Sequence, residues 1–350
     1  MSTWDLLAGL PLIVEEYELE GHEVALSSEL VRKTTVIRLR GSGEEGAGED
    51  VTYAAEDQEA LQRAGASRWP LTGTWTLQSF AEHLRSLDLF PQPTERPEFR
   101  LYRDWAFDSA ALDLALRQAG TTLHAALGRE PAPVRFVASL RLGEPPSLQP
   151  LLARLEIAPG LRFKLDPTPS WDEELIAQLV ALDAVDSVDL KGQYEGTIVD
   201  NPADPELYRR VVEAFPDAWI EDPKLTEETE AILLAHRERV TWDAPIHSVA
   251  DIQALPWPPR TINIKPSRLG GLQSLLDTYD YCAASDIGCY GGGQSELSVG
   301  RGQIQYLASL FHADAPNDVA PAGFNMPQPA PDLPSSPMEP APSSLGFRWG

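Results

Sequence analysis

The sequence predicts an α/β protein in which a TIM-like (β/α)7β barrel follows a smaller α+β domain. Two observations predict the barrel. From Val134 onward, short apolar runs typical of strands alternate with helical stretches, giving eight strands separated by seven helical stretches. Polar residues also stand at the C-terminal ends of five successive strands, whereas an open doubly wound sheet gathers its ligand contacts mainly at one switch point. We therefore prefer the barrel to the doubly wound sheet that the same alternation allows.

Residues 1–128 are expected to form the smaller domain, with strands first and helices after them. The strand-like runs lie at residues 13–19, 23–26, 34–39 and 47–53, with a glycine-rich turn at 41–46. One helix face is expected from four apolar residues at helical spacing, namely Leu77, Phe80, Leu84 and Leu87. Alanines and leucines recur over residues 105–127, which predicts a long helix with Asp108 in its first turn.

Residues 129–325 are expected to form the barrel. Its strands are predicted at residues 134–140, 161–165, 185–190, 219–220, 240–242, 261–264, 287–290 and 318–319. Its helices are predicted at residues 171–182, 205–214, 226–236, 249–255, 269–285 and 297–311, with a weaker, proline-rich stretch after the first strand.

Residues 326–350 contain seven prolines and cannot form a regular helix or a central strand. We expect an extended strap that runs back over the first domain, anchored by Leu345, Phe347 and Trp349. A disordered tail is the alternative, but it would leave this aromatic pair exposed.

Composition restricts the partners and the compartment. The chain of 350 residues carries a formal net charge of -25, from 28 basic and 53 acidic residues. This charge argues against nucleic acid and anionic membranes as partners. No apolar run approaches the roughly 18 residues of a membrane span, and the first residues lack the basic segment of a signal peptide. Two cysteines exclude a disulfide framework, so we expect a cytoplasmic protein; whether it assembles as a homo-oligomer stays open.

Five charged residues stand at the ends of predicted barrel strands: Lys164, Asp189, Glu221, Asp243 and Lys265. In a parallel barrel such positions face one mouth, where active sites lie. Neighbouring strands are about 5 Å apart, so three carboxylates there would repel unless a cation joined them. Carboxylate oxygens suit Mg²⁺, with Mn²⁺ as the alternative metal. Taken singly, each acid is equally consistent with a helix cap, a surface charge or a turn, and each lysine with a salt bridge.

The motifs around these residues resemble the enolase superfamily, in its muconate-lactonizing and o-succinylbenzoate-synthase branch, over nearly the whole chain. The matching segments are R-x-K at 162–164, D-x-K at 189–191, E-x-P at 221–223, Asp-Ala at 243–244 and Ile-Asn-Ile-Lys-Pro-Ser-Arg-Leu-Gly-Gly at 262–271. The last is the most specific match. On this resemblance, residues 1–128 are the capping domain.

The resemblance implies an enzyme that abstracts the α-proton of a small carboxylate substrate and forms an enediolate. The acid/base pair would be Lys164 and Lys265. The Mg²⁺ ligands would be Asp189, Glu221 and Asp243. The implied substrate contacts are Ser139, Arg162, Lys191, Gly292, Gly293 and Glu296. Elimination, as in o-succinylbenzoate synthesis, cycloisomerisation and racemisation all remain open.

Three departures from the family pattern support a second hypothesis, a catalytically silent homologue that binds a ligand or has a structural role. Arg162 replaces a lysine, Lys191 replaces an asparagine and Ala244 replaces a glutamate. Arg162 and a metal beside Lys164 are expected to lower the pKa of that lysine. Lys191 would either bind a second substrate carboxylate or pair with Asp222. A nucleotide-binding protein ranks last, because no glycine-rich turn follows the first strands.

The cap loops expected over the mouth, residues 15–22 and 43–53, are acidic. They favour a substrate whose distal group is neutral or cationic, whereas Lys191 favours a dianion. The sequence leaves this conflict unresolved.

Overall fold

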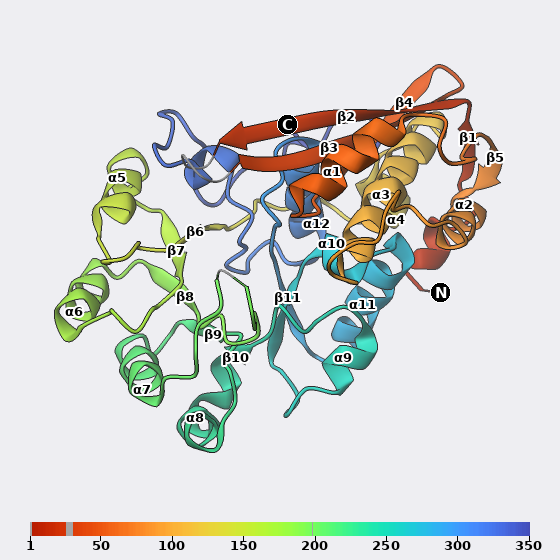
Figure 1. Ribbon diagram of the computed structural model, residues 1–350. Helices are drawn as coiled ribbons and strands as arrows, with labels where there is room; N and C mark the ends of the chain where they lie inside the picture. Colours follow the sequence, from red (N-terminus) through yellow and green to blue (C-terminus); the bar gives the residue numbers. More distant parts are fainter. Residues whose placement is uncertain (1, 26–30, 198) are drawn as a thin grey trace.

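The computed structural model describes residues 2–25, 31–197 and 199–350, and it shows a small α+β part lying across one end of a parallel barrel (Figure 1). In the small part, three antiparallel strands follow the order β2 (Glu16–Ala25), β3 (Val31–Gly41), β4 (Glu44–Asp50). A separate pair joins β1 (Pro11–Val14) to β5 (Gly73–Thr76). The helices are η1 (Trp4–Leu6), α1 (Ala55–Ala64), α2 (Leu77–Arg85), α3 (Phe99–Gln118) and α4 (Leu123–Leu127).

Several details of this part differ from the expectation. The predicted run 13–19 is divided between β1 and β2, Leu26 lies outside the described residues, and the sequence analysis did not predict α1 or β5. Helix α3 begins at Phe99, so Asp108 lies in its middle rather than in its first turn. The helix is nevertheless buried over most of its length, because it packs directly on β4. At Gly48 a Cβ atom would lie 2.1 Å from the carbonyl oxygen of Ala106, so only glycine allows this approach.

The second part is a closed barrel, as predicted. A five-stranded parallel sheet has the order β10 (Val240–Thr241), β9 (Trp219–Glu221), β8 (Val185–Asp189), β7 (Arg162–Leu165), β6 (Val137–Leu140). Strands β11 (Thr261–Ile264) and β12 (Gly288–Gly291) form a parallel pair beside it. The Asn263 amide donates to the Trp242 carbonyl at 3.0 Å, which joins the two sheets. Isolated bridges at Asn317 and Asp318, where a last short strand was expected, close the ring between β12 and β6.

Helices cover the outside of this ring (Figure 1). They are α5 (Gln149–Ile157), α6 (Glu173–Leu182), α7 (Pro205–Ala214), α8 (Glu227–Leu233), η2 (Leu234–Arg239), α9 (Val249–Gln253), α10 (Pro266–Leu269), α11 (Leu272–Ala284) and α12 (Val299–Phe311), with η3 (Ala322–Asn325) near the end. Side-chain caps mark several starts: the carboxylate or hydroxyl of Asp172, Asp204, Thr226 and Ser248 accepts an amide hydrogen of the first turn. These caps, followed by apolar residues at helical spacing, explain why the alternation could be read from the sequence.

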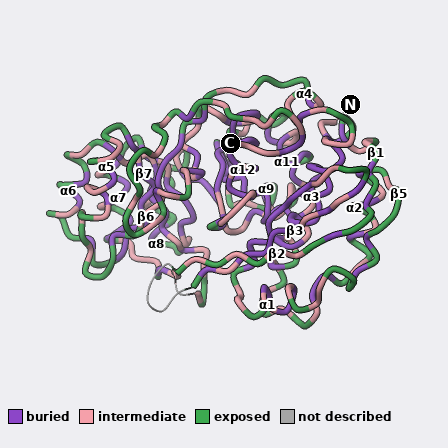
Figure 2. Tube along the Cα trace, turned by 90° about the horizontal axis from the view of Figure 1, so that it is seen from above, coloured by how far each residue is buried: buried purple, intermediate pink, exposed green. Residues whose placement is uncertain are grey.

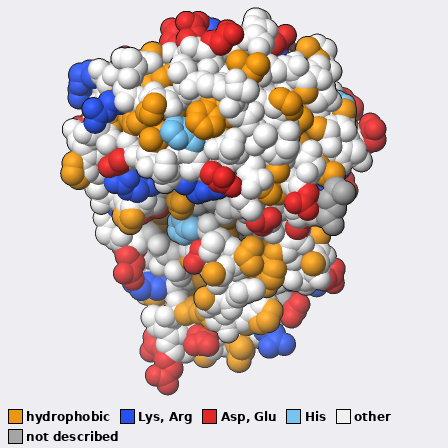
Figure 3. Space-filling model, turned by 90° about the vertical axis from the view of Figure 1, so that its right-hand side faces the viewer, with side chains coloured by type: hydrophobic (Ala, Val, Ile, Leu, Met, Phe, Trp, Pro, Cys, Tyr) orange, Lys and Arg blue, Asp and Glu red, His pale blue; other side chains and the backbone are white. Residues whose placement is uncertain are grey.

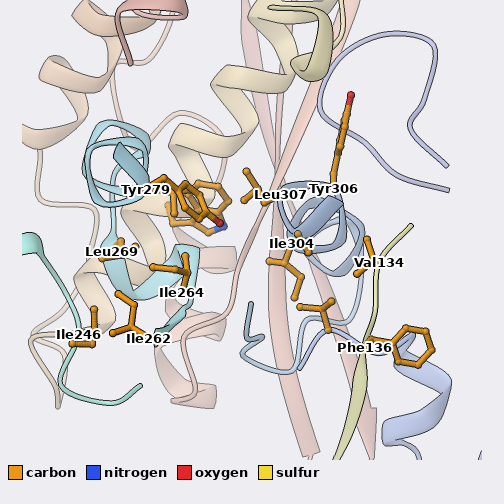
Figure 4. Packing of buried hydrophobic residues seen from close by; sticks show 14 of the residues in the cluster. Val134, Phe136, Ile246, Ile262, Ile264, Leu269, Tyr279, Ile304, Tyr306 and Leu307 are labelled. Carbon is orange, nitrogen blue, oxygen red and sulfur yellow. The ribbon is translucent and has the colours of Figure 1, made fainter. Parts of the chain in front are cut away.

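The apolar core runs from the barrel into the small part without a break. Buried residues follow α3, β3 and α12, while the exposed residues lie on the outer turns and helix faces (Figure 2). Ile304 and Leu307 of α12 pack in this core, as do Val134 and Phe136 just before β6 (Figure 4). The continuous core holds the two parts in contact at the mouth of the barrel.

The end of the chain lies against α3 and α12. The Gly346 amide donates to the Thr121 carbonyl at 2.8 Å, and the amide of Phe347 donates to the buried carboxylate of Asp113 at 2.8 Å. The Phe347 ring is fully buried between Trp105 and Tyr306, with ring centroids 6.3 and 5.9 Å away. The division of the chain at residues 128 and 325 stays a prediction.

Charged side chains are spread over the surface. Acidic groups occur across the face shown in Figure 3 instead of gathering in one patch. Within the described ranges, no helix is both long enough and apolar enough to cross a membrane.

Replacing Asp104 of α3 with asparagine is expected to stabilise the protein at pH 8 and to have little effect at pH 4. Burial and the neighbouring Asp108 raise the pKa of Asp104 to about 7, although Arg100, Arg85 and Arg103 oppose this. The folded state therefore binds more protons than the unfolded state between about pH 4 and 7, so the free energy of unfolding falls as pH rises through this range. Asparagine does not ionise, so the variant avoids this loss in the free energy of unfolding.

The expected gain at pH 8 is of order 1–3 kcal/mol, since one pKa unit corresponds to about 1.4 kcal/mol. Urea unfolding of the wild type and Asp104→Asn at both pH values measures it. Asp314→Asn, at an exposed aspartate, is the matched control. An Asp104→Asn effect that does not depend on pH would contradict the prediction.

Candidate functional site

The five charged residues predicted at the strand ends do converge at the barrel mouth. Lys164 is in β7, Asp189 and Glu221 end β8 and β9, Asp243 follows β10, and Lys265 follows β11. All five are at most 8% exposed. The parallel strands carry them to one end of the barrel, so ionisable groups that are 22 or more residues apart in the chain share one desolvated space.

Three carboxylates form the tightest acidic group among the described residues. Oxygen atoms of Asp189, Glu221 and Asp222 all lie within 4.8 Å of one another, and all three side chains are buried. This group contains two of the three expected metal ligands. Asp222 completes this group, and Asp243, the third expected ligand, lies outside it.

Asp243 is turned to basic and phenolic groups. Its Oδ2 lies 2.8 Å from Nζ of Lys265 and accepts from the hydroxyl of Tyr194 at 2.9 Å. Its Oδ1 accepts from Nη1 of Arg268 at 2.7 Å, and Nη2 of the same arginine donates to the Tyr194 hydroxyl at 3.0 Å. Although burial opposes ionisation, Arg268 and Lys265 hold the pKa of Asp243 well below its usual range.

Asp222 holds the backbone of Asp243 in place. Its two oxygens accept the amide hydrogens of Asp243 at 2.8 Å and of Ala244 at 2.9 Å. Burial first, and then the neighbouring acids, raise the pKa of Asp222 to about 7. The suggested pairing of Asp222 with Lys191 is wrong, because the carboxylate is used by these two amides and Lys191 binds Asp189 instead.

Lys164 is held between carboxylates. Its Nζ lies 3.0 Å from Oδ2 of Asp189, contacts Oε1 of Glu221 and lies 3.7 Å from Asp318. Burial disfavours its charged form, but the attraction of Asp189 and Glu221 dominates and raises the pKa of Lys164 well above its usual value. This direction is the opposite of the lowered pKa that we expected from Arg162 and a metal.

Arg162 is not part of the site in the structure. Its Nε donates to Asp186 and its Nη1 donates to the Asp183 carbonyl at 2.7 Å, and the side chain is 34% exposed. Arg162 precedes Lys164 by two residues, so it lies about 6–7 Å nearer the other end of the barrel. There it contacts Asp186, near the start of β8.

Glu221 accepts hydrogen bonds from two other strands, β12 and β11, and the sequence did not predict these contacts. The hydroxyl of Tyr290, in β12, donates to its Oε2, and Nδ2 of Asn263 lies 3.5 Å from the same oxygen. The hydroxyl of Thr241 donates to that of Tyr290 at 3.3 Å. Burial and then the charge of Glu221 raise the pKa of Tyr290 well above its usual value, so the phenol stays a donor. No spacing rule in the sequence predicts these contacts to Glu221. The contact of Arg268 with Asp243 was also not predicted, although Arg268 lies inside the segment 262–271 that carried the resemblance.

A cavity of about 1500 Å³ opens above these acids. Of the expected substrate contacts, Ser139, Lys191, Gly293 and Glu296 line it together with Lys265. The other two expected contacts, Arg162 and Gly292, are not among the described residues that line the cavity. A Cβ at Gly292 would lie 2.7 Å from Cε of Lys265, so this glycine leaves room for the lysine.

The cap contributes Arg32 and Tyr53 to the wall of the cavity. The guanidinium of Arg32 lies 4.4 Å above the Tyr53 ring, and all its described hydrogen bonds go to backbone carbonyls, including those of Val51 and Gln294. The acidic residues 15–22 do not line the cavity. Glu18 and Glu20 instead pair with Arg40 and Arg38. The wall therefore lacks the acids of residues 15–22, but the cap residues Glu95 and Glu98 line it together with Arg32.

The donor set fits a divalent cation. Six carboxylates gather at the mouth: Asp166, Asp189, Glu221, Asp222, Asp243 and Asp318. Four cations contact or surround them: Lys164, Lys191, Lys265 and Arg268. Hard oxygen donors of this kind suit Mg²⁺.

Comparisons with known proteins agree with this geometry. The family model described as the C-terminal domain of DUF8230, a domain of unknown function, matches residues 130–326, and its N-terminal counterpart matches residues 5–126. An o-succinylbenzoate synthase of Geobacillus stearothermophilus is 29% identical over 61% of this chain, and the match spans 58% of that enzyme's length. An N-succinylamino acid racemase of an Amycolatopsis species is 27% identical, and the match covers 85% of this chain and 81% of the racemase.

A solved structure of an enolase-superfamily member from Listeria innocua covers 89% of this chain and 86% of its own, with a TM-score of 0.64 at 18% identity. That likeness concerns the fold, which agrees with the barrel and cap described above. The resemblance found in the sequence motifs is thereby confirmed. The chain belongs to the DUF8230 family, and its two parts together have the fold of the enolase superfamily.

Proposed function

We propose that the protein abstracts the α-proton of a carboxylate substrate, in a reaction that depends on Mg²⁺ and passes through an enediolate. The observation that carries the proposal is the convergence of two buried lysines and three buried carboxylates at one mouth of the barrel. Lys164 lies on Asp189 and Glu221, and Lys265 lies 2.8 Å from Asp243. α-Proton abstraction requires one base beside the substrate, and a second lysine can stabilise the developing charge or return a proton.

Asp189, Glu221 and Asp222 or Asp243 would hold the metal. A divalent cation there would stabilise the negative charge that develops on the substrate carboxylate. One lysine, in its neutral form, takes the α-proton as the C–H bond breaks, and the electron pair moves toward the carboxylate. The ammonium of the opposite lysine stabilises that charge or returns a proton. Ser139 and Gly293 line the cavity where the substrate would lie.

The proposal leaves the final outcome to be measured. The names of two relatives correspond to o-succinylbenzoate synthesis and to the racemisation of N-succinylamino acids. Racemisation needs both lysines to exchange protons with the substrate, whereas elimination needs one base and one stabilising charge. Cycloisomerisation is the third class in question.

Exchange of the α-hydrogen in deuterated water tests the proposal. Purified protein with Mg²⁺ is incubated with a panel of mono- and dicarboxylic acids that includes N-succinylamino acids, and ¹H NMR follows the loss of the α-proton signal. We expect exchange with at least one acid and loss of exchange on chelation of the metal. Exchange that persists with chelator would overturn the metal dependence.

A catalytically silent homologue is the second candidate. The observation that favours it is that the site acids already pair with protein cations, Asp243 with both Lys265 and Arg268. It predicts no exchange with any acid of the panel at saturating Mg²⁺.

A further inference from the structure

Two lysines share one oxygen of a candidate metal ligand. Nζ of Lys191 lies 2.5 Å, and Nζ of Lys164 3.0 Å, from Oδ2 of Asp189. A divalent cation that bound this oxygen would meet both ammonium groups at close range. Like charges at such distances repel strongly in a desolvated site, so one lysine must leave.

Lys191 is the lysine that can leave. Lys164 is 2% exposed, is held by Glu221 as well, and is not among the described residues that line the cavity. Lys191 lines the cavity. It therefore lies between the cavity and the carboxylate of Asp189, on the side from which a metal and a substrate would arrive.

A second position for the ammonium is already present. Oδ1 of Asp166 lies 3.8 Å from Nζ of Lys191, beyond hydrogen-bond distance. Asp166 is 8% exposed and lines the cavity, and its Oδ1 has no hydrogen-bond partner among the described residues. The Tyr194 ring, 4.9 Å from the same Nζ, forms another favourable wall for a cation. A buried carboxylate oxygen without a protein partner is costly, so an ammonium placed against it would be stabilised.

The backbone of Lys191 stays fixed during such a move. Its amide donates to Oδ1 of Asp189 at 3.1 Å, and the next amide, of Gly192, donates to the Asp222 carbonyl at 2.8 Å. The residue has a φ of 54°, in the left-handed region. Only side-chain rotations are then needed to carry the ammonium from Asp189 to Asp166.

We propose that Lys191 competes with the metal: its ammonium occupies Asp189 in the metal-free protein and moves to Asp166 when a divalent cation binds. The inference rests on the proposed function, because it assumes that Asp189 is a metal ligand. It has two consequences. Metal affinity is lower than the acids alone would give, and the displaced ammonium lies beside the cavity in the loaded protein.

Titration calorimetry of the metal-free protein with MgCl₂, repeated with MnCl₂, tests this. Lys191→Met, which keeps the length but removes the charge, is expected to bind Mg²⁺ about 10-fold or more tightly than the wild type. Asp166→Asn is expected to bind several-fold more weakly, because the ammonium loses its second position. In the double variant Lys191→Met/Asp166→Asn, the effect of the Asp166 change is expected to disappear.

Lys224→Met is the matched control. Lys224 lines the same cavity but pairs with Glu195 at 2.6 Å, away from Asp189. Its removal is expected to change metal affinity less than 2-fold. Equal effects at Lys224 and Lys191, or a persistent Asp166 effect in the double variant, would show general electrostatics and overturn the inference.

The other outcomes separate the two proposals. If the wild type and Lys191→Met bind the metal equally, or the variant binds more weakly, the competition is absent while the metal site stands. If neither protein nor the double variant binds Mg²⁺ or Mn²⁺, the proposed function fails and the inference fails with it. Binding by Lys191→Met alone would support the inference in its strongest form.

Discussion

Lys164→Met is expected to slow α-proton exchange by about 10²–10⁴-fold, the range that a positioned general acid or base contributes. Lys164 is buried among Asp189, Glu221 and Asp318, and of the two lysines at Asp189 it is the one that also contacts Glu221. The loss is expected in kcat more than in KM, because the amine acts on the reacting hydrogen and not on the distal part of the substrate. The NMR exchange assay at saturating Mg²⁺ measures it.

Lys164→Arg separates the two roles of this side chain. Arginine keeps the positive charge but cannot be deprotonated to accept a proton. If Lys164 is the base, both variants lose exchange; if it only stabilises charge, the arginine variant retains far more activity than the methionine variant. Lys33→Met, at a lysine that pairs with Glu59 on the cap, serves as the surface control. Wild-type exchange in Lys164→Met would exclude any direct role.

The convergence of Lys164, Asp189, Glu221 and Lys265 could be predicted because it depends on one regular property. Each lies at or next to the C-terminal end of a strand of a parallel barrel, and the register of such strands carries their ends to one mouth. Arg162 shows the limit of the same reasoning. Arg162 lies two residues before Lys164 on β7 and contacts Asp186 near the start of β8. A residue that matches the family motif is therefore not always part of the site.

The contacts that the sequence did not predict arise where side chains from distant segments meet. Tyr290 reaches Glu221 from β12, and Tyr194 reaches Asp243 from the segment after β8. Their partners depend on side-chain length and direction within a closed ring, which no periodicity records. The pairing of Lys191 with Asp189 instead of Asp222 has the same origin, because a left-handed backbone at Lys191 turns its side chain back onto β8.

Arg103→Met is expected to lower the free energy of unfolding by about 3–5 kcal/mol, the cost of leaving one partner of a buried ion pair without its opposite charge. Arg103 and Asp50 are both fully buried, with Nε of the arginine 2.7 Å from Oδ2 of the aspartate. The guanidinium also donates to the carbonyls of Leu89 at 3.0 Å and Asp57 at 3.1 Å, and it lies 3.7 Å from the centre of the Phe90 ring. Methionine fills the volume but leaves these acceptors unsatisfied.

Arg100→Met, one turn earlier on α3, is the matched control. Arg100 pairs with Asp88 at 2.8 Å, yet both side chains are largely exposed, so the expected loss is below about 1 kcal/mol. Urea unfolding of the wild type and both variants gives the comparison. Similar losses for Arg103 and Arg100 would show that burial does not determine the strength of these pairs.

The Arg103 variant should also affect the cavity. Asp50, which Arg103 holds, accepts the amide and the hydroxyl hydrogen of Thr52 at 2.9 and 2.7 Å, and Tyr53 beside it lines the cavity. Loosening Asp50 therefore releases the cap segment that faces the substrate. The exchange assay is expected to show a raised KM with a smaller change in kcat, since Lys164 and Lys265 belong to the barrel. A fall in kcat alone would mean that the cap segment does not contact the substrate.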